Sequence, residues 1–408
     1  LPSRPGHCRA AEVTCANHGR ALFGAPACMK GILMSSTSLN RINALRAAAS
    51  DAGIDAFYVC DTSNIHWLSA FDGVFDEESA HALLVTADAA ALHTDSRYSD
   101  ACEKAATAQG GALEVDSERV AHAKFAASRL LAGEPEGVGR VVGIEDSMTL
   151  AGFRSLESAF SHLRVHAALK ETSSFIVKLR GVKDAGEISR MKAAQAITDA
   201  AFSHIIGFMK AGMTEREVQI ELEDFMVRHG ACGLAFPSIV ACGENGASPH
   251  AVPGQTKLES GQCVVMDFGA RAQGYCSDMT RTVFLGEPSA KLAAGYAAIR
   301  DANEQVEAAL KPGMTGKEAH ELAEHVLAEH GFAGKMGHSL GHGVGIDIHE
   351  EPLLSPRNGA PLVPGNVVTV EPGVYLSGDF GMRLEDFGVI TETGYEVFTQ
   401  STHDMVVL

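Results

Sequence analysis

Hydrophobic positions in the first third of the chain switch between helical and strand spacing. Leu39, Ile42, Leu45 and Ala49 recur every three to four residues, which predicts a helix over 39–52. Short apolar runs predict strands at 56–60, 82–86, 90–95 and 141–145, with a turn at 61–64 and helices at 101–108 and 120–132. Strands that alternate with helices over this length predict a small α/β domain, which we place at 34–170.

A second region begins near residue 178, and it contains an internal repeat. A long amphipathic pattern predicts a helix over 187–209. The segments 211–230 and 312–331 then both contain GlyMetThr near their start and HisGly at their end. Each has the Thr-x-x-Glu pattern of a capping box, formed by Thr214 with Glu217 and by Thr315 with Glu318. The repeat predicts two similar helices that end at a glycine.

The repeat extends to two apolar runs that end in an acid. CysValValMetAsp ends at Asp267 and ValValThrValGlu ends at Glu371, an offset of 104 residues, while the GlyMetThr segments are offset by 101. Asp278 follows Asp267 by 11 residues, and Glu385 follows Glu371 by 14. Both spacings fit a hairpin that offers one carboxylate from each strand. We therefore expect two related halves with their carboxylates at a shared interface.

The stretch 337–352 contains three histidines, His338, His342 and His349, with glycines between them. The spacing of the first two resembles the HExxH motif, but no glutamate lies between them and the glycines disfavour a helix, so that motif is excluded. The glycine-rich context and the nearby acids favour a functional role for His342 and His349. His250 follows SerPro just before the first acidic strand, which makes it a candidate for proton transfer.

Four carboxylates that converge with one imidazole would repel one another strongly unless cations lay among them. Oxygen-rich ligation with a single histidine suits Mn²⁺ first, with Co²⁺, Fe²⁺ or Zn²⁺ as further possibilities. Two such ions can lower the pKa of a shared water toward 7 and so provide a nucleophile without a serine or cysteine. The pattern predicts a hydrolytic site with two divalent metal ions.

Composition limits the class of protein. The chain has 408 residues, 46% of them hydrophobic, and a net charge of −18, which disfavours nucleic acid and anionic membranes as partners. None of its apolar runs is long enough for a membrane helix. Nine cysteines without CxxC spacing are typical of reduced thiols in a cytoplasmic protein.

Two segments allow different interpretations. Residues 1–33 show no apolar periodicity, and Gly24, Pro26 and Lys30 interrupt their mildly apolar stretch, which favours a disordered extension or a non-native upstream start over a signal peptide. The group Asp95, Arg97 and Tyr98 follows a predicted strand and could border a site. Within this domain alone, a capped turn is the favoured interpretation.

Residues 178–408 resemble the pita-bread metallopeptidases, the superfamily of methionine aminopeptidase, prolidase and aminopeptidase P. Its five metal-ligand positions match Asp267, Asp278, His342, Glu371 and Glu385 in order and context. The motifs HisSerLeuGlyHisGlyValGly and HisGluGluPro are similar to those of the prolidase and aminopeptidase P branch. Residues 34–170 resemble the creatinase/prolidase N-terminal domain. The resemblance implies an α/β N-terminal domain followed by an α+β catalytic domain with a pseudo-two-fold repeat.

This resemblance also implies a reaction, hydrolysis of the Xaa-Pro bond in short proline-containing peptides by a homodimer. Asp278 and Glu385 would bridge the metals, Asp267 would complete one site, and His342 with Glu371 the other. Glu371 would exchange protons with the reacting water, His250 and His349 would hold the substrate, and Arg383 would support a carboxylate. An arginine found in some prolidases is replaced by Leu353, which leaves room for peptides longer than two residues.

Two alternatives remain open on the sequence. One is a catalytically inactive binding protein with the same fold, and the other is a creatinase-like hydrolase of small C–N substrates. The intact set of five ligand positions counts against both. A methionine aminopeptidase would not need the N-terminal domain.

Overall fold

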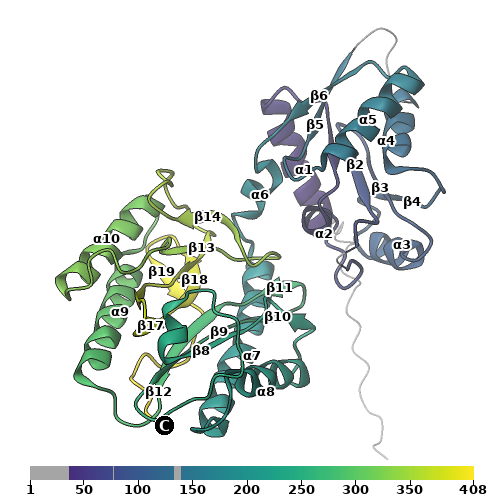
Figure 1. The fold of residues 1–408 in the computed structure, drawn as a ribbon. Helices are drawn as coiled ribbons and strands as arrows, with labels where there is room; N and C mark the ends of the chain where they lie inside the picture. Colours follow the sequence, from purple (N-terminus) through teal and green to yellow (C-terminus); the bar gives the residue numbers. More distant parts are fainter. Residues whose placement is uncertain (1–35, 77, 133–138) are drawn as a thin grey trace, which may run out of the picture. The chain divides into compact units, whose positions relative to one another are not determined.

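The computed structural model describes residues 36–76, 78–132 and 139–408, so the prediction for residues 1–33 lies outside the described residues. Its first third is built on a mixed six-stranded sheet in the order β4-β3-β2-β1-β5-β6 (Figure 1). The elements are α1 (Thr37–Asp51), β1 (Ala56–Val59), α2 (Thr62–Ser69), β2 (Ala82–Thr86), β3 (Ala90–His93), α3 (Ser99–Ala108), β4 (Glu114–Asp116), α4 (His122–Ala132), β5 (Arg140–Ile144), α5 (Leu150–Leu163) and β6 (Ala167–Glu171). The predicted α/β organisation of this region is confirmed.

Strand β1 shows why this sheet is covered on both faces. All four of its residues are buried, and successive side chains of a strand point to opposite faces. Phe57 and Val59 pack into the cluster that contains α1, α2 and α3, whereas Ala56 and Tyr58 pack into the one that contains α4 and α5. A continuous apolar run therefore marks a central strand between two helical layers.

The predicted turn at 61–64 is wrong, because these residues begin helix α2. The Asp61 side chain accepts a hydrogen bond from the backbone N–H of Asn64, which makes Asp61 an N-cap. Ile65 and Leu68 of the helix are then fully buried. The Asp-Thr-Ser-Asn composition suits a turn and a helix start equally well, and burial of the following apolar residues decides between them.

The second region contains two sets of helices and strands. The first set consists of α6 (Phe175–Arg180), α7 (Ala185–Phe208), α8 (Glu215–Arg228), β7 (Gly233–Leu234), β8 (Ile239–Cys242), the 3₁₀ helix η1 (Gly243–Ala247), β9 (Cys263–Phe268), β10 (Ala270–Ala272), β11 (Tyr275–Cys276) and β12 (Met279–Phe284). The second consists of α9 (Ala290–Ala309), α10 (Gly316–Glu329), β13 (Gly341–Gly343), β14 (Glu350–Leu354), β15 (Val367–Val370), β16 (Gly373–Leu376), β17 (Phe380–Arg383), β18 (Asp386–Ile390) and β19 (Tyr395–Val397).

Corresponding contacts recur in the two sets at the offsets seen in the sequence. Both α8 and α10 start with a complete capping box, as predicted. Cys242 of β8 pairs with Val264 of β9, and Gly343 of β13 pairs with Val368 of β15, which reproduces offsets of 101 and 104. Strands β8 and β13 are therefore equivalent, and so are β9 and β15.

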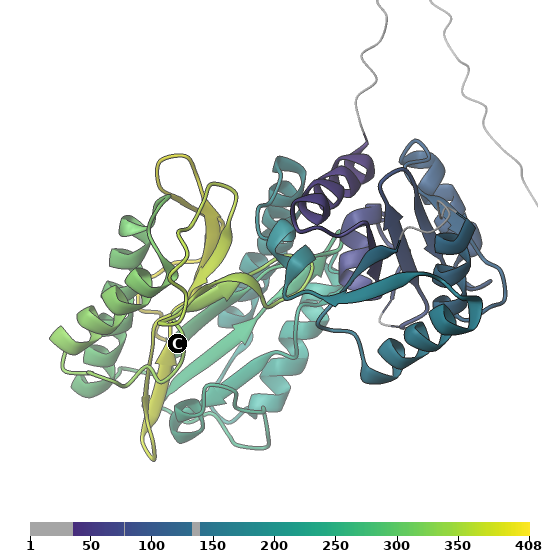
Figure 2. The same cartoon turned by 90° about the horizontal axis from the view of Figure 1, so that it is seen from above.

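Each set has its own hydrophobic core. Helices α7 and α8 pack on β8, β9 and β12, while α9 and α10 pack on β15 to β18. Helices α9 and α10 lie side by side, in green, in both views (Figures 1 and 2). Within the described residues, no helix combines the length and apolar character needed to cross a membrane. The helical layers leave the inner strand ends free to carry functional side chains.

Candidate active site

The acidic residues lie where the paired strands of each half end. Asp267 is on β9, opposite Thr280 of β12, and Asp278 directly precedes β12. Glu371 directly follows β15, and Glu385 directly precedes its partner strand β18. The two predicted carboxylate hairpins are therefore present, each interrupted by a short pair of additional strands.

A contact between the two halves brings these strand ends together. The backbone N–H of Glu385 donates to the carbonyl oxygen of Thr280 at 3.1 Å, and the Thr280 hydroxyl donates to Glu385 Oε2 at 2.7 Å. Thr280 lies two residues after Asp278 and is completely buried. The sequence placed the acids at strand ends, but it gave no indication that Thr280 joins the halves.

All eight predicted site residues line one cavity of about 510 Å³. They are Asp267, Asp278, His342, Glu371, Glu385, His250, His349 and Arg383. His342 Nε2 lies 3.5 Å from Asp278 Oδ2 and 3.5 Å from Glu371 Oε1. The rings of His342 and His349 are 4.4 Å apart between centroids. Side chains more than 130 residues apart in sequence thus converge on one volume.

The electrostatics of this cavity favour bound cations. Burial raises the pKa of Asp278 well above its usual range, and the charges of Asp267 and Glu371 raise it further. Burial similarly raises the pKa of Glu371 to about 8. Four carboxylates line the cavity with Arg383 as their only guanidinium among the lining residues. Bound divalent cations stabilise a dense group of buried carboxylates that repel one another.

Three further observations fit a metal. Ligand atoms of Asp278, His342 and Glu385 lie within 4.8 Å of one another, close enough to share an ion. Asp267 Oδ1 is buried and has no hydrogen-bond partner among the described residues. Burial also lowers the pKa of His342 to about 3, which keeps its imidazole neutral and able to ligate. The donor set of carboxylates and one neutral imidazole suits a hard or borderline divalent ion.

Arg383 holds Asp267 and its neighbours in place through polar contacts. Its guanidinium forms a salt bridge with Asp267, and its Nε donates to the Thr280 hydroxyl at 2.9 Å. Its Nη1 donates to the Tyr375 hydroxyl at 2.7 Å, and the same hydroxyl lies 3.1 Å from His338 Nε2. Sequence reasoning selected Arg383 but assigned no role to Tyr375 or His338. Those two residues form polar contacts that no local pattern marks.

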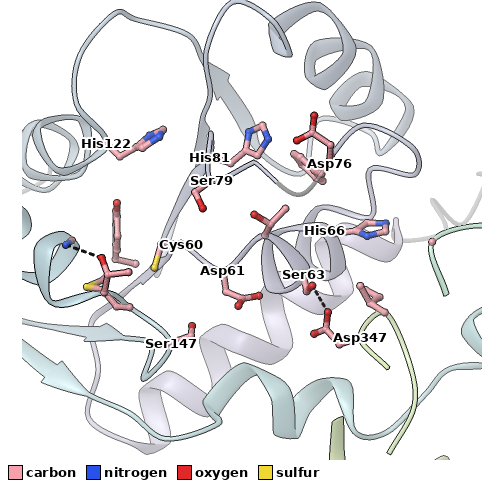
Figure 3. A pocket seen from close by; sticks show the side chains of 18 of the residues that line it. Cys60, Asp61, Ser63, His66, Asp76, Ser79, His81, His122, Ser147 and Asp347 are labelled. Atoms are coloured by element: carbon pink, nitrogen blue, oxygen red, sulfur yellow. Dashed lines mark hydrogen bonds between the residues drawn. The ribbon is translucent and has the colours of Figure 1, made fainter. Parts of the chain in front are cut away.

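A larger cavity, of about 1010 Å³, lies mainly in the N-terminal sheet region (Figure 3). His66, His81 and His122 line it, but its acids already have partners. Asp61 caps α2, and Asp76 accepts a hydrogen bond from Tyr98. Among the described residues that line this cavity, no three metal-ligating side chains have their ligand atoms within 4.8 Å of one another. The smaller cavity is therefore the better candidate for catalysis.

The turn after β3 has the favoured capped structure. Asp95 Oδ1 accepts the backbone N–H of Arg97 at 2.8 Å, and Arg97 forms an exposed salt bridge with Asp95. These groups border a separate cavity of about 420 Å³.

Comparisons with known proteins agree with the fold. Residues 189–392 match the model of metallopeptidase family M24, and residues 41–182 match the creatinase/prolidase N-terminal domain. An uncharacterized peptidase of Bacillus subtilis, YqhT, is 38% identical over 368 residues, which cover 90% of this chain and 100% of YqhT. The chain belongs to metallopeptidase family M24, and the predicted fold class is confirmed.

Solved structures extend the comparison over both regions. A Xaa-Pro dipeptidase from Bacillus anthracis has a TM-score of 0.83 and 35% identity, covering 91% of this chain and 100% of the other. An X-Pro aminopeptidase from Thermotoga maritima has a TM-score of 0.78 and 33% identity, covering 89% and 100%. A prolidase from Pyrococcus horikoshii has a TM-score of 0.80 and 28% identity, covering 90% and 100%.

Proposed function

We propose that this chain is a two-metal peptidase that hydrolyses the Xaa-Pro bond at the N-terminus of dipeptides and short peptides. The observation that carries the proposal is the convergence of the five ligand-pattern residues with His250, His349 and Arg383 on one cavity. The names of the structural relatives, Xaa-Pro dipeptidase and X-Pro aminopeptidase, support the same substrate class.

In this proposal Asp278 and Glu385 would help to hold both of two divalent ions, most readily Mn²⁺. Asp267 would help to hold one ion, and His342 with Glu371 would help to hold the other. When bound, the ions would supply a Lewis acid and a water of lowered pKa. Glu371 would accept and return a proton during hydrolysis. Arg383 orients Asp267 through their salt bridge and favours its charged form, which opposes the effect of burial on the pKa of Asp267.

His250 and His349 orient the substrate, and apolar residues select proline. Both histidines line the cavity together with Phe236, Ile239, Ile348 and Leu353. An Xaa-Pro bond has no N–H on its nitrogen, so a site for it needs apolar walls around a rigid ring rather than a hydrogen-bond acceptor. A cavity of this size accommodates a short peptide.

Two other properties belong to this proposal, the cellular compartment and the oligomeric state. The six cysteines in the described residues are all free thiols, which supports a reducing compartment such as the cytoplasm. A homodimer, as the family resemblance implies, is part of the same proposal.

We expect Mn²⁺-loaded protein to cleave Ala-Pro and Ala-Pro-Ala, and to cleave Ala-Ala and Ala-Ala-Ala at least ~100-fold less efficiently, because a shaped apolar pocket discriminates by about this factor. The measurement is kcat/KM for the four peptides after chelation and reloading. Comparable values for the alanine peptides would exclude proline selectivity. Failure to cleave any of the four would favour the inactive or creatinase-like alternatives.

We expect Leu353→Arg to shift preference from tripeptides toward dipeptides. Leu353 lines the cavity and is 38% exposed, so a guanidinium there can reach the carboxylate of a bound dipeptide. One charge-assisted hydrogen bond contributes ~1.5–3 kcal/mol, or roughly 10- to 100-fold in the Ala-Pro to Ala-Pro-Ala ratio. Leu353→Met is the matched control. Arg357, four residues further along the chain, is not among the residues lining this cavity. An unchanged ratio in the arginine variant would show that Leu353 does not face the substrate's C-terminus.

A further inference from the structure

His250 and His349 lie on equivalent loops of the two halves. His250 is in the connection from β8 to β9, and His349 is in the connection from β13 to β15, whose strands correspond at offsets of 101 and 104. A loop that carries a substrate-orienting side chain has to be held in place, because a displacement of about 1 Å can cost roughly 100-fold in rate. The His250 loop therefore needs contacts that fix its position.

One buried carboxylate contacts this loop near both ends. Glu215, the first residue of α8, has its Oε1 2.9 Å from the backbone N–H of Cys242 and 3.0 Å from Asn245 Nδ2. Its Oε2 accepts the backbone N–H of Gly254 at 3.1 Å. His250 lies between these anchor points. Glu215 thus joins residues before and after the histidine through a single side chain.

Glu215 is an unusual residue to bury for packing alone. It is 1% exposed, and no salt bridge among the described residues includes it. Its charge is balanced by three N–H donors and by the N-terminus of α8, where an acidic side chain is favoured. Hydrogen bonds to a charged acceptor are stronger than neutral ones, and a buried donor left without its partner is costly. These contacts hold the loop in one position.

The other half of the repeat shows that the helix itself does not require a glutamate here. The equivalent first residue of α10 is Gly316, offset by 101. A Cβ at Gly316 would lie 2.1 Å from the carbonyl oxygen of Leu353, so that loop packs directly on the helix backbone. The Thr-x-x-Glu capping box is present in both helices. Glu215 is therefore specific to the half whose loop carries His250.

We propose that Glu215 is a positioning residue that fixes the loop from Cys242 to Gly254 and thereby places His250 toward the substrate. This inference rests on the proposed function, in which His250 orients the peptide. Glu215 itself lines neither the active-site cavity nor the ligand set. It therefore acts on turnover through this loop and not by contact with the substrate.

A double-mutant cycle tests this mechanism. Glu215→Gln keeps the size of the side chain but replaces one acceptor with a donor that faces another donor. We expect it to lower kcat/KM for Ala-Pro-Ala by ~10- to 100-fold. In a His250→Asn background the same change should alter kcat/KM less than about twofold, because the group that Glu215 positions is already absent. Equal losses in both backgrounds would overturn the proposal.

The matched control is Glu217→Gln in the first turn of the same helix. Glu217 is exposed, and among the described residues its side chain forms hydrogen bonds only with Thr214 of the capping box, in which glutamine also functions. This variant should retain wild-type kcat/KM. A loss equal to that of Glu215→Gln would assign the effect to helix α8 as a whole and contradict the proposal.

Hydrogen exchange provides a measurement that does not depend on turnover. Amides of residues 242–256 should exchange faster in Glu215→Gln and at the wild-type rate in Glu217→Gln, with the bound-metal content unchanged in both. Wild-type exchange in Glu215→Gln would overturn the loop assignment. If the wild-type protein cleaved no Xaa-Pro peptide, the proposed function would fail, and the exchange experiment would still decide whether Glu215 holds the loop.

Discussion

Asp278→Asn is expected to reduce Xaa-Pro turnover by more than ~100-fold, beyond the range typical for loss of a residue that only supports a ligand. Asp278 is 3% exposed, and one of its oxygens lies 3.5 Å from His342 Nε2. An amide has no charge to offer a cation, so a ligand shared by two ions would be lost. Turnover on Ala-Pro-Ala at saturating Mn²⁺ is the measurement.

The same substitution should leave the metal-free fold intact or stabilise it. Burial and the charges of Asp267 and Glu371 raise the pKa of Asp278 because they disfavour its charged form. A neutral asparagine removes that repulsion. The melting temperature of metal-free Asp278→Asn should therefore equal or exceed that of the metal-free wild type. A clear decrease would show that Asp278 is held by structural contacts rather than opposed by its neighbours.

Added metal should raise the melting temperature of the wild type more than that of Asp278→Asn. At 100 times its dissociation constant, a metal that binds only the folded state stabilises it by about 2.7 kcal/mol, or about 5–10 °C for a domain-sized protein. The wild type should show this gain, and Asp278→Asn should show much less. Asp379→Asn, which changes an exposed carboxylate paired with Lys291, is the control and should behave as the wild type.

Arg180→Met is expected to destabilise the protein by ~3–5 kcal/mol, the usual cost of breaking a buried ion pair by removing one partner. Arg180 and Lys183 are both buried, and both form salt bridges with Glu350, which is 2% exposed in its side chain. Arg180 also donates to Asn64 Oδ1 at 2.7 Å. Loss of the guanidinium leaves Glu350 with the ammonium of Lys183 and the backbone N–H of Asp347. The melting temperature should decrease by about 5–10 °C.

Controls separate the ion pair from general damage. Lys178→Met changes an exposed lysine on the same helix, α6, and should leave the melting temperature unchanged. Replacing Arg180, Lys183 and Glu350 together with apolar residues should cost less than Arg180→Met alone, because no buried charge remains unpaired. If the triple variant were the least stable, burial of the charges would not be the cause. Glu350 adjoins His349, so turnover should also decrease in Arg180→Met.

Local features of the fold could be predicted from sequence, because their signals lie within a few residues. The capping boxes of α8 and α10 are examples, since one Thr and one Glu fix where each helix starts. The turn predicted at 61–64 failed because the same four residues suit a helix N-cap. Burial of Ile65 and Leu68 against the rest of the sheet favours the helix over the turn, and the local sequence does not encode that burial.

The candidate site was predictable in its members but not in its assembly. Acids at the ends of apolar runs marked Asp267 and Glu371, and the family resemblance assigned ligand positions to all five. The contacts that hold them could not be predicted, because they join residues far apart in sequence. Thr280 meets Glu385 across 105 residues, and Arg383 meets Asp267 across 116. The contacts of Glu215 with Cys242 and Gly254 span 27 and 39 residues and have no local signal either.

The central claim, that five side chains form one two-metal hydrolytic site, is tested most directly by counting metal ions in the samples used for turnover. Metal-free protein would be titrated with Mn²⁺ while bound metal and Ala-Pro-Ala hydrolysis are measured together. We predict that turnover reaches its maximum at two ions per chain and that Asp278→Asn loses both tight binding and turnover. Full hydrolysis by the metal-free chain, or wild-type metal content and activity in Asp278→Asn, would contradict the account.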